Sequence, residues 1–128
     1  MMTRHAYLII AHNNFEQLNF LLSLLDDERN DIFLFVDKKS FAQFNNDKIE
    51  VAKSKLKVYS PFQISWGGYS LCKATLFLLK EAIDQGEYSY FHLLSGADLP
   101  LHSQAYIHDF FEKYAGYEFL AFVGQELY

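Results

Sequence analysis

Short apolar runs that have no polar face alternate with helix-like segments along this chain, and this alternation constrains its fold most strongly. The runs cover residues 6–11, 32–36, 56–59, 88–94 and 119–123. Such runs are typical of strands in a parallel sheet, because helices cover both faces of that sheet and leave no polar side. The sequence therefore predicts an α/β fold with a mainly parallel sheet flanked by helices.

Three of the intervening segments carry the signals of helices. Asn14, followed by Gln17 three residues later, predicts a helix start, and apolar residues then recur at helical spacing at Phe15, Leu18, Leu21, Leu22 and Leu25. Ser70 is predicted to cap a second helix that runs to about Gln85. Ser103 is predicted to cap a third helix, with an apolar side made of Ile107, Phe110, Phe111 and Tyr114.

Composition narrows the class of protein. The 128 residues suffice for one domain with one core, and the net charge of −5 argues against nucleic-acid binding, which needs clustered positive charge. Cys72 is the only cysteine, which excludes an intrachain disulfide and a cysteine-based zinc site. No signal peptide precedes the first run, and no apolar run approaches the roughly 20 residues that span a bilayer. We therefore expect a cytoplasmic protein without a transmembrane segment.

Polar turns follow several of the predicted strands. The sequence Ser-Gly-Ala-Asp at residues 95–98 follows one apolar run, Asp37 follows another, and Trp-Gly-Gly-Tyr-Ser at residues 66–70 precedes the second helix. Ligands of open α/β sheets bind outside the carboxyl ends of the strands. Three polar turns of this kind predict a nucleotide or sugar site.

Several familiar sites are absent from the sequence. Ala-His-Asn-Asn at residues 11–14 stands where a dinucleotide-binding protein has Gly-x-Gly-x-x-Gly, and no Gly-x-x-x-x-Gly-Lys loop or His-Glu-x-x-His motif occurs. There is also no Asp-x-Asp pair of the kind that holds a divalent cation against a diphosphate. A catalytic triad of Ser95, His92 and Asp98 is excluded because His92 lies inside a predicted strand and no nucleophile elbow surrounds Ser95.

Four motifs together resemble the core-2/I-branching glycosyltransferase family. They are YLIIAH at residues 7–12, DIFLFVDKKS at 31–40, WGGYS at 66–70 and SGADLP at 95–100. The family includes β-1,6-N-acetylglucosaminyltransferases and peptide O-xylosyltransferases. The motifs occur in the family's order and span nearly the whole chain, which corresponds to about the N-terminal half of a family member. A start directly on the first strand resembles the bacterial members.

The resemblance implies a GT-A-like (Rossmann-like) α/β domain that is incomplete at its C-terminus, with residues 1–128 forming the donor-binding half. Family members are inverting, metal-independent enzymes that take a sugar from a UDP-sugar, here N-acetylglucosamine, so no cofactor is expected. The acceptor would be a hydroxyl of a glycan or glycolipid, with the protein peripheral at the inner membrane. The general base and the cations that meet the diphosphate would lie beyond Tyr128, so this fragment alone would be inactive.

The resemblance also implies donor contacts at the ends of the first two strands. Ala11 and His12 match the part of the family site that contacts the uracil. Asp37 matches the acid that holds the nucleoside. The alternative for Asp37 is that its carboxylate only caps the turn that it makes with Ser40.

The other implied donor contacts lie in the two later motifs. Trp66, Gly67 and Gly68 would bring backbone close to the donor beside a helix N-terminus, which favours anions. Ser95 and Asp98 would contact the donor sugar or hold the turn. Structural alternatives remain open: Trp66 as a core plug, the glycines as residues needed only for their backbone angles, and Asp98 as an acceptor of backbone N–H groups.

Two sets of residues are interpreted as structural rather than functional. The lysines of the DKKS motif, Lys38 and Lys39, are interpreted as solvated loop residues, with attraction of the diphosphate as the alternative. The histidines outside the first motif are interpreted as structural or exposed: His5, His92, His102 and His108.

Alternative functions also remain open at this stage. The donor could be UDP-xylose, and the chain could be a truncated, non-catalytic module that binds nucleotide or another chain. A different α/β nucleotide-binding enzyme, such as a hydrolase, is a further alternative.

Overall fold

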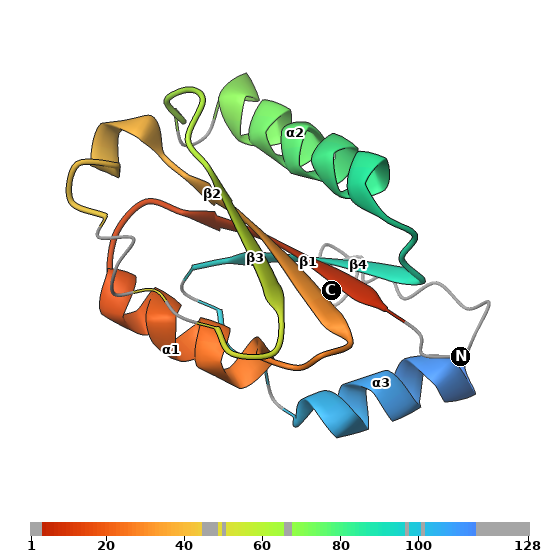
Figure 1. The fold of residues 1–128 in the computed structure, drawn as a ribbon. Coiled ribbons are helices and arrows are strands. Elements are labelled where there is room, and N and C mark those ends of the chain that lie inside the picture. Colours follow the sequence, from red (N-terminus) through yellow and green to blue (C-terminus); the bar gives the residue numbers. More distant parts are fainter. Residues whose placement is uncertain are drawn as a thin grey trace, which may run out of the picture.

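The structure is a computed structural model that describes residues 4–44, 49, 51–65, 68–96, 98–100 and 102–114. The described chain has four strands and three α-helices, and an α-helix follows every strand except the second (Figure 1). The elements in order are β1 (His5–Ala11), α1 (Phe15–Leu25), β2 (Asn30–Val36), the 3₁₀ turn η1 (Lys38–Ser40), β3 (Lys55–Tyr59), α2 (Tyr69–Gln85), β4 (Tyr90–Ser95) and α3 (Gln104–Lys113).

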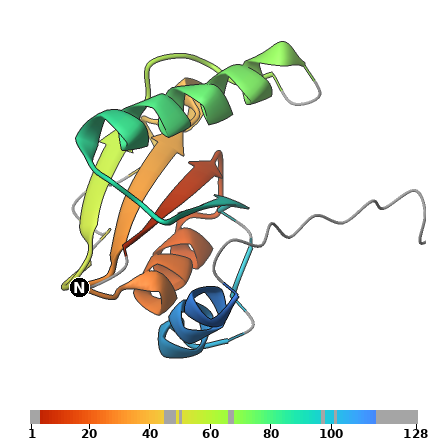
Figure 2. The same cartoon turned by 90° about the vertical axis from the view of Figure 1, so that its right-hand side faces the viewer.

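The four strands form one parallel sheet in the order β3-β2-β1-β4. β1 lies at the centre, where His5 pairs with Asn30 of β2 and with Tyr90 of β4. Helix α2 covers one face of the sheet, and α1 and α3 lie on the other (Figure 2). The predicted α/β fold with a parallel sheet flanked by helices is therefore confirmed, while the strand predicted at residues 119–123 lies outside the described residues.

Two hydrophobic layers hold the helices to the sheet. Alternate residues of β1 point to opposite faces: Tyr7, Ile9 and Ala11 join the core under α1, whereas Leu8 and Ile10 join the core under α2. Every residue of β1 and β2 is buried. Full burial of a large aliphatic side chain contributes about 1.5–3 kcal/mol, so these two strands supply much of the stability.

The helix starts at Asn14 and Ser103 agree with the prediction. The Asn14 side chain accepts a hydrogen bond from the Gln17 N–H (3.4 Å), and the Ser103 side chain accepts one from the Tyr106 N–H (3.2 Å). Asn14 has a φ of 51°, a left-handed conformation that asparagine tolerates better than most residues. The short polar side chain therefore caps α1 and also permits the sharp turn after β1.

The start of α2 and the inward side of α3 differ from the prediction. Gly68, not Ser70, is the N-cap of α2, because the Ser70 hydroxyl is engaged by the Ser65 N–H (2.6 Å). On α3 the buried residues are Gln104 and His108, whereas the predicted apolar residues Ile107, Phe110, Phe111 and Tyr114 are only half-buried or exposed. Among the described residues, no helix combines the length and apolarity needed to cross a bilayer.

Candidate functional site

The ends of β1, β2 and β4 meet at one edge of the sheet. The Asp37 N–H donates to the Ala11 carbonyl oxygen (2.9 Å), and the Gly96 N–H donates to the Ile10 carbonyl oxygen (2.9 Å). The structure therefore brings together the strand-end residues that the sequence singled out, with β1 in the middle. This is the edge at which open α/β sheets bind ligands.

A close approach between Gly96 and Ala11 sets the shape of this edge. A Cβ atom at Gly96 would lie 3.0 Å from the Ala11 Cβ and 3.7 Å from the Leu18 Cδ1. Ala11 is 1% exposed and packs into the core under α1, so it can offer a ligand only its backbone. His12, the next residue, is exposed and is the first side chain at this edge that a ligand can reach from solvent.

The Asp37 carboxylate is buried and ties two segments together. Its Oδ1 accepts hydrogen bonds from the Lys39 N–H (3.2 Å) and the Ile64 N–H (3.1 Å). Its Oδ2 lies 3.6 Å from the Lys39 ammonium, and the side chain is 2% exposed. The turn-capping role predicted as the alternative is therefore present: the Ser40 N–H donates to the Asp37 carbonyl oxygen (2.9 Å), and the carboxylate caps this turn at the Lys39 N–H. Oδ2 is the oxygen that a ligand could use.

The Lys39 side chain is half exposed, as predicted, but its ammonium also has partners in the protein. Its ammonium donates to the Ile64 carbonyl oxygen (2.9 Å), across the gap between the end of β2 and the loop of residues 60–65. The Ser60 hydroxyl also ties this loop to β2 by donating to the Val36 carbonyl oxygen (2.7 Å). Sequence reasoning missed these contacts because they join residues about 25 positions apart.

The first turn of α2 follows directly on this loop. The Gly68 N–H donates to the Ser65 carbonyl oxygen (3.0 Å), and a Cβ at Gly68 would lie 3.3 Å from that oxygen. Among the described residues, no side chain caps the N-terminus of α2, and a helix N-terminus attracts anions. Trp66 and Gly67, the other two residues predicted here, lie outside the described residues.

Ser95 and Asp98 close a tight turn at the end of β4. Oδ2 of Asp98 accepts from the Ser95 N–H (2.8 Å), and the Asp98 N–H donates to the Ser95 carbonyl oxygen (3.1 Å). Asp98 is exposed and Ser95 is half-buried. One oxygen of Asp98 thus holds the turn, as one of the two interpretations predicted.

A second polar cluster lies at the opposite end of β1, where α3 packs against the sheet. His92 Nε2 and His5 Nδ1 are 3.0 Å apart, and the rings of His5 and His108 stack with centroids 3.8 Å apart. Burial, followed by the positive charge that neighbouring histidines would carry, lowers the pKa of His5 to about 3. The same causes lower the pKa of His92 to about 4, and burial lowers that of His108. These three histidines are therefore neutral at pH 7.

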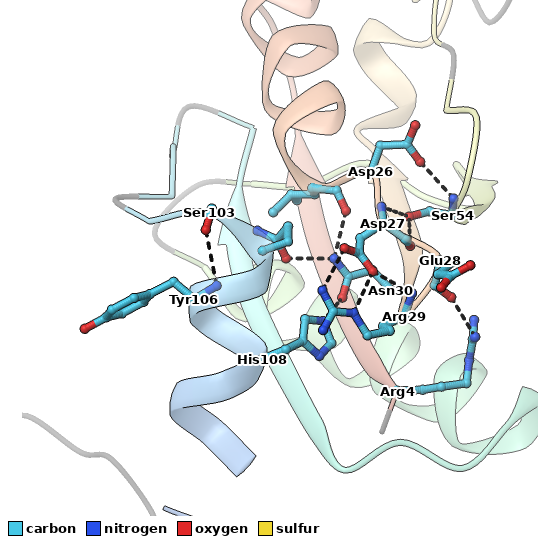
Figure 3. Close-up of polar contacts among 12 residues, drawn as sticks. Arg4, Asp26, Asp27, Glu28, Arg29, Asn30, Ser54, Ser103, Tyr106 and His108 are labelled. Carbon is cyan, nitrogen blue, oxygen red and sulfur yellow. Dashed lines mark hydrogen bonds and ion pairs between the residues drawn. The ribbon is translucent and has the colours of Figure 1, made fainter. Parts of the chain in front are cut away.

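Asn30 and Gln104 complete this histidine cluster, part of which Figure 3 shows. The Asn30 side-chain amide donates to the Leu25 carbonyl oxygen (2.8 Å) and to Gln104 Oε1 (2.7 Å). Its Oδ1 must then accept from His108 Nε2 (2.8 Å), which fixes the proton on that nitrogen. The Tyr7 hydroxyl also donates to Gln104 Oε1 (3.1 Å), so α3 docks through polar contacts as well as through the ring of Phe111, 4.5 Å from that of Tyr90. The structural interpretation of these histidines agrees with this arrangement.

Asp26, at the end of α1, organises the chain before β3. Its carboxylate accepts hydrogen bonds from the N–H groups of Ala52 (2.7 Å), Lys53 (2.8 Å) and Ser54 (2.8 Å). Figure 3 shows the contact with Ser54. Burial alone would raise the pKa of Asp26, but these hydrogen bonds outweigh it and lower the pKa. This carboxylate is structural and lies away from the strand-end edge.

Comparison with known proteins gives a match to a family model. The model described as Core-2/I-Branching enzyme matches residues 5–123, which include every strand and helix that the structure describes. No curated protein gives a significant match. Among the described residues, no three histidine, cysteine, aspartate or glutamate side chains are grouped so that they could hold a metal ion.

Proposed function

The chain belongs to the Core-2/I-Branching enzyme family, a family of glycosyltransferases, and from this premise we propose that it binds the donor of an inverting sugar transfer. The donor is a UDP-sugar, with N-acetylglucosamine as the sugar, and the acceptor is a hydroxyl of a glycan or glycolipid. The donor site is the edge where β1, β2 and β4 end. Residues 1–128 contribute this donor-binding part, and no metal ion takes part.

One observation carries the proposal: three strand ends and the uncapped start of α2 lie around one edge of the sheet. A site for a nucleoside diphosphate needs a backbone surface against which the base can lie, a hydrogen-bond acceptor for the ribose hydroxyls and a positive environment for the diphosphate. The strand ends offer the first two. The N-terminus of α2 offers part of the third, because a helix N-terminus is a positive environment for an anion.

Individual roles are assigned from the exposure of each residue and from its place at this edge of the sheet. His12 is exposed beside the end of β1 and is assigned to the uracil, with the Ala11 backbone as part of the surface against which the base lies. Oδ2 of Asp37 is assigned to a ribose hydroxyl, which would approach from the side of the half-exposed Lys39. Ser95 and Asp98 are assigned to the sugar, and Gly68 to the diphosphate. Trp66 and Gly67 are assigned to the donor on sequence alone.

The transfer also needs a carboxylate base, and none of the residues described above is assigned to that role. A carboxylate base removes the proton of the acceptor hydroxyl, whose oxygen then attacks the anomeric carbon as the bond to the UDP oxygen breaks on the opposite face. Negative charge grows on the departing UDP and must be met by donors already in place. We place the base beyond Tyr128, so residues 1–128 alone should bind the donor without turning it over.

Calorimetric titration with UDP in the presence of EDTA tests the proposal. The informative variant is Asp37→Asn, because the amide keeps an oxygen to accept from the Ile64 N–H while the carboxylate charge is lost. Losing a charged hydrogen-bond acceptor should weaken UDP binding by roughly tenfold. The matched control is Asp109→Ala, which removes an exposed carboxylate on α3 next to His108, and His108 stacks on His5 at the end of β1 opposite the donor site. Circular dichroism shows whether each variant is folded.

The outcomes separate the interpretations of the site. Binding that survives EDTA and weakens in Asp37→Asn but not in Asp109→Ala would support a metal-free nucleoside site. Binding unchanged in Asp37→Asn would leave Asp37 a purely structural role. A folded chain that does not bind UDP would refute the proposed donor site in these residues. Competition between UDP-N-acetylglucosamine and UDP-xylose then decides which sugar the site prefers.

A further inference from the structure

The loop of residues 60–65, which joins β3 to α2, is fastened to the end of β2 at Ile64. Ile64 is fully buried, and both of its backbone polar groups are engaged by the DKKS motif. Its N–H donates to Asp37 Oδ1 (3.1 Å), and its carbonyl oxygen accepts from the Lys39 ammonium (2.9 Å). The same ammonium lies 3.6 Å from Asp37 Oδ2, so Lys39, Asp37 and Ile64 form a closed triangle, called here the loop latch.

Two other contacts tie this loop to the end of β2 without a charged side chain, while the Lys73 ammonium of α2 lies over the Phe62 ring, 4.5 Å from its centroid. The Lys38 N–H donates to the Phe62 carbonyl oxygen (3.3 Å) through the backbone, and the Ser60 hydroxyl donates to the Val36 carbonyl oxygen (2.7 Å). Lys39 differs because its ammonium bridges the carboxylate of one segment and the carbonyl group of the other. A hydrogen bond from a charged donor is roughly twice as strong as one between neutral groups.

The loop latch fixes the place from which α2 begins. Ser65 follows Ile64 directly, and its backbone accepts from the Gly68 N–H (3.0 Å) and donates to the Ser70 hydroxyl (2.6 Å). The first turn of α2 is thus attached to Ser65, and Ser65 is attached through Ile64 to the end of β2. A shift of Ile64 would carry the start of α2 away from Asp37.

We propose that Lys39 is a positioning residue of the donor site: its ammonium, by holding the Ile64 carbonyl group beside the Asp37 carboxylate, sets the distance between the end of β2 and the start of α2. Lys39 acts through Asp37 and Ile64 and need not touch the donor. The inference rests on the proposed donor site and deepens it. It adds a residue whose side chain is half exposed and would otherwise be taken for a solvated lysine.

Three variants of the full 128-residue chain test this role. Lys39→Met removes the ammonium but keeps a long unbranched side chain, and Lys39→Arg keeps a charged donor. Lys38→Met is the matched control, because it removes the charge of the exposed neighbouring lysine and leaves that residue's backbone contact intact. Trp66 is the only tryptophan and lies two residues after Ile64 in the chain, so its fluorescence reports on this region.

Two measurements are made on each variant: quenching of Trp66 fluorescence by acrylamide, and calorimetric titration with UDP in EDTA. In Lys39→Met the quenching constant should change and the Kd for UDP should rise by roughly tenfold, the factor expected from one lost charge-assisted hydrogen bond. Lys39→Arg should recover most of the affinity, and Lys38→Met should resemble the unmodified chain in both measurements.

The results that would overturn the inference differ from those that would overturn the donor site. Unchanged quenching and UDP affinity in Lys39→Met, while the unmodified chain binds UDP, would refute the role of Lys39 alone. An equal loss in Lys38→Met would assign the effect to general attraction of the diphosphate by positive charge and would also refute it. Failure of the unmodified chain to bind UDP would refute the proposed donor site. Unfolding of Lys39→Met, seen by circular dichroism, would make Lys39 a stability residue instead.

Discussion

As the pH falls, the histidine cluster under α3 should make the protein lose stability at pH values well above those at which its carboxylates titrate. His5, His92 and His108 all have a pKa lowered by burial, to about 3 for His5 and about 4 for His92, whereas a histidine in the unfolded chain titrates at 6.5. Between these values the unfolded state binds more protons than the folded state. The stability is therefore fully present above pH 6.5 and falls as the pH falls through that value.

The size of the loss follows from the unfolded-state pKa. Between pH 7 and pH 5, each histidine that stays neutral in the folded state costs about 2 kcal/mol of unfolding free energy. His5 and His92 together therefore cost about 4 kcal/mol, and His108 adds a loss of the same sign. Asp26 and Asp27 do not contribute in this interval, because their pKa values are lowered from 3.8 and their stabilisation is lost only near and below that pH. The histidine loss is a large fraction of a typical domain stability of about 5–15 kcal/mol.

Urea unfolding followed by far-ultraviolet circular dichroism at pH 7, 6 and 5 measures this loss. His92→Gln should lower stability at pH 7, because the contact with His5 is lost, but should reduce the loss between pH 7 and pH 5 by about 2 kcal/mol. The control is His102→Gln, which changes an exposed histidine outside the cluster and should keep the full pH dependence. A loss below about 1 kcal/mol between pH 7 and pH 5 would refute the reasoning, because it would mean that the buried histidines accept protons without disruption.

Three further substitutions test single contacts, each by urea unfolding at pH 7. Gly96→Ala should destabilise the chain by about 1–3 kcal/mol through overpacking against Ala11. Combining Gly96→Ala with Ala11→Gly should recover part of the lost stability. If the stability losses of the two single variants simply add in the double variant, the proposed contact between residues 96 and 11 is contradicted. Asp26→Ala should cost about 1–3 kcal/mol, because three backbone N–H groups lose their acceptor. Ser103→Ala should cost about 1 kcal/mol as a lost helix cap, with a matching loss of helical signal if α3 detaches. An effect on helical signal without any change in unfolding free energy would argue against that cap.

The sheet and most helix boundaries were predictable because they depend on local patterns. Apolar runs with no polar face marked β1 and β2, and the structure buries both strands completely. Asn14 and Ser103 marked helix starts because a cap involves atoms only three residues apart. The gathering of strand-end residues also followed from a general rule about parallel sheets, so the edge was predictable before its geometry was known.

What the sequence did not predict depends on contacts between distant residues. Nothing near Lys39 indicates that its ammonium reaches Ile64, because the contact exists only once β2 and the loop before α2 lie side by side. The buried side of α3 was predicted only in part for a similar reason. The hydrophobic pattern chose Phe111, whose ring lies 4.5 Å from that of Tyr90 on β4, but it missed Gln104 and His108, which are buried because they find hydrogen-bond partners on the sheet. Hydrophobic patterning does not find polar residues that a helix buries against hydrogen-bonding groups.

The central place of β1 in the sheet has a consequence for synthesis of the chain. β1 pairs with β2 soon after both emerge, but its other edge waits for β4, about 85 residues later. At a translation rate of about 5–20 residues per second, this wait lasts roughly 4–17 s. Until then the apolar segment from Ala6 to Ala11 has an open edge, the kind of surface on which chains join into aggregates. Nascent chains that stop before β4 should therefore depend on chaperones that hold exposed strands, and slower translation should increase that dependence.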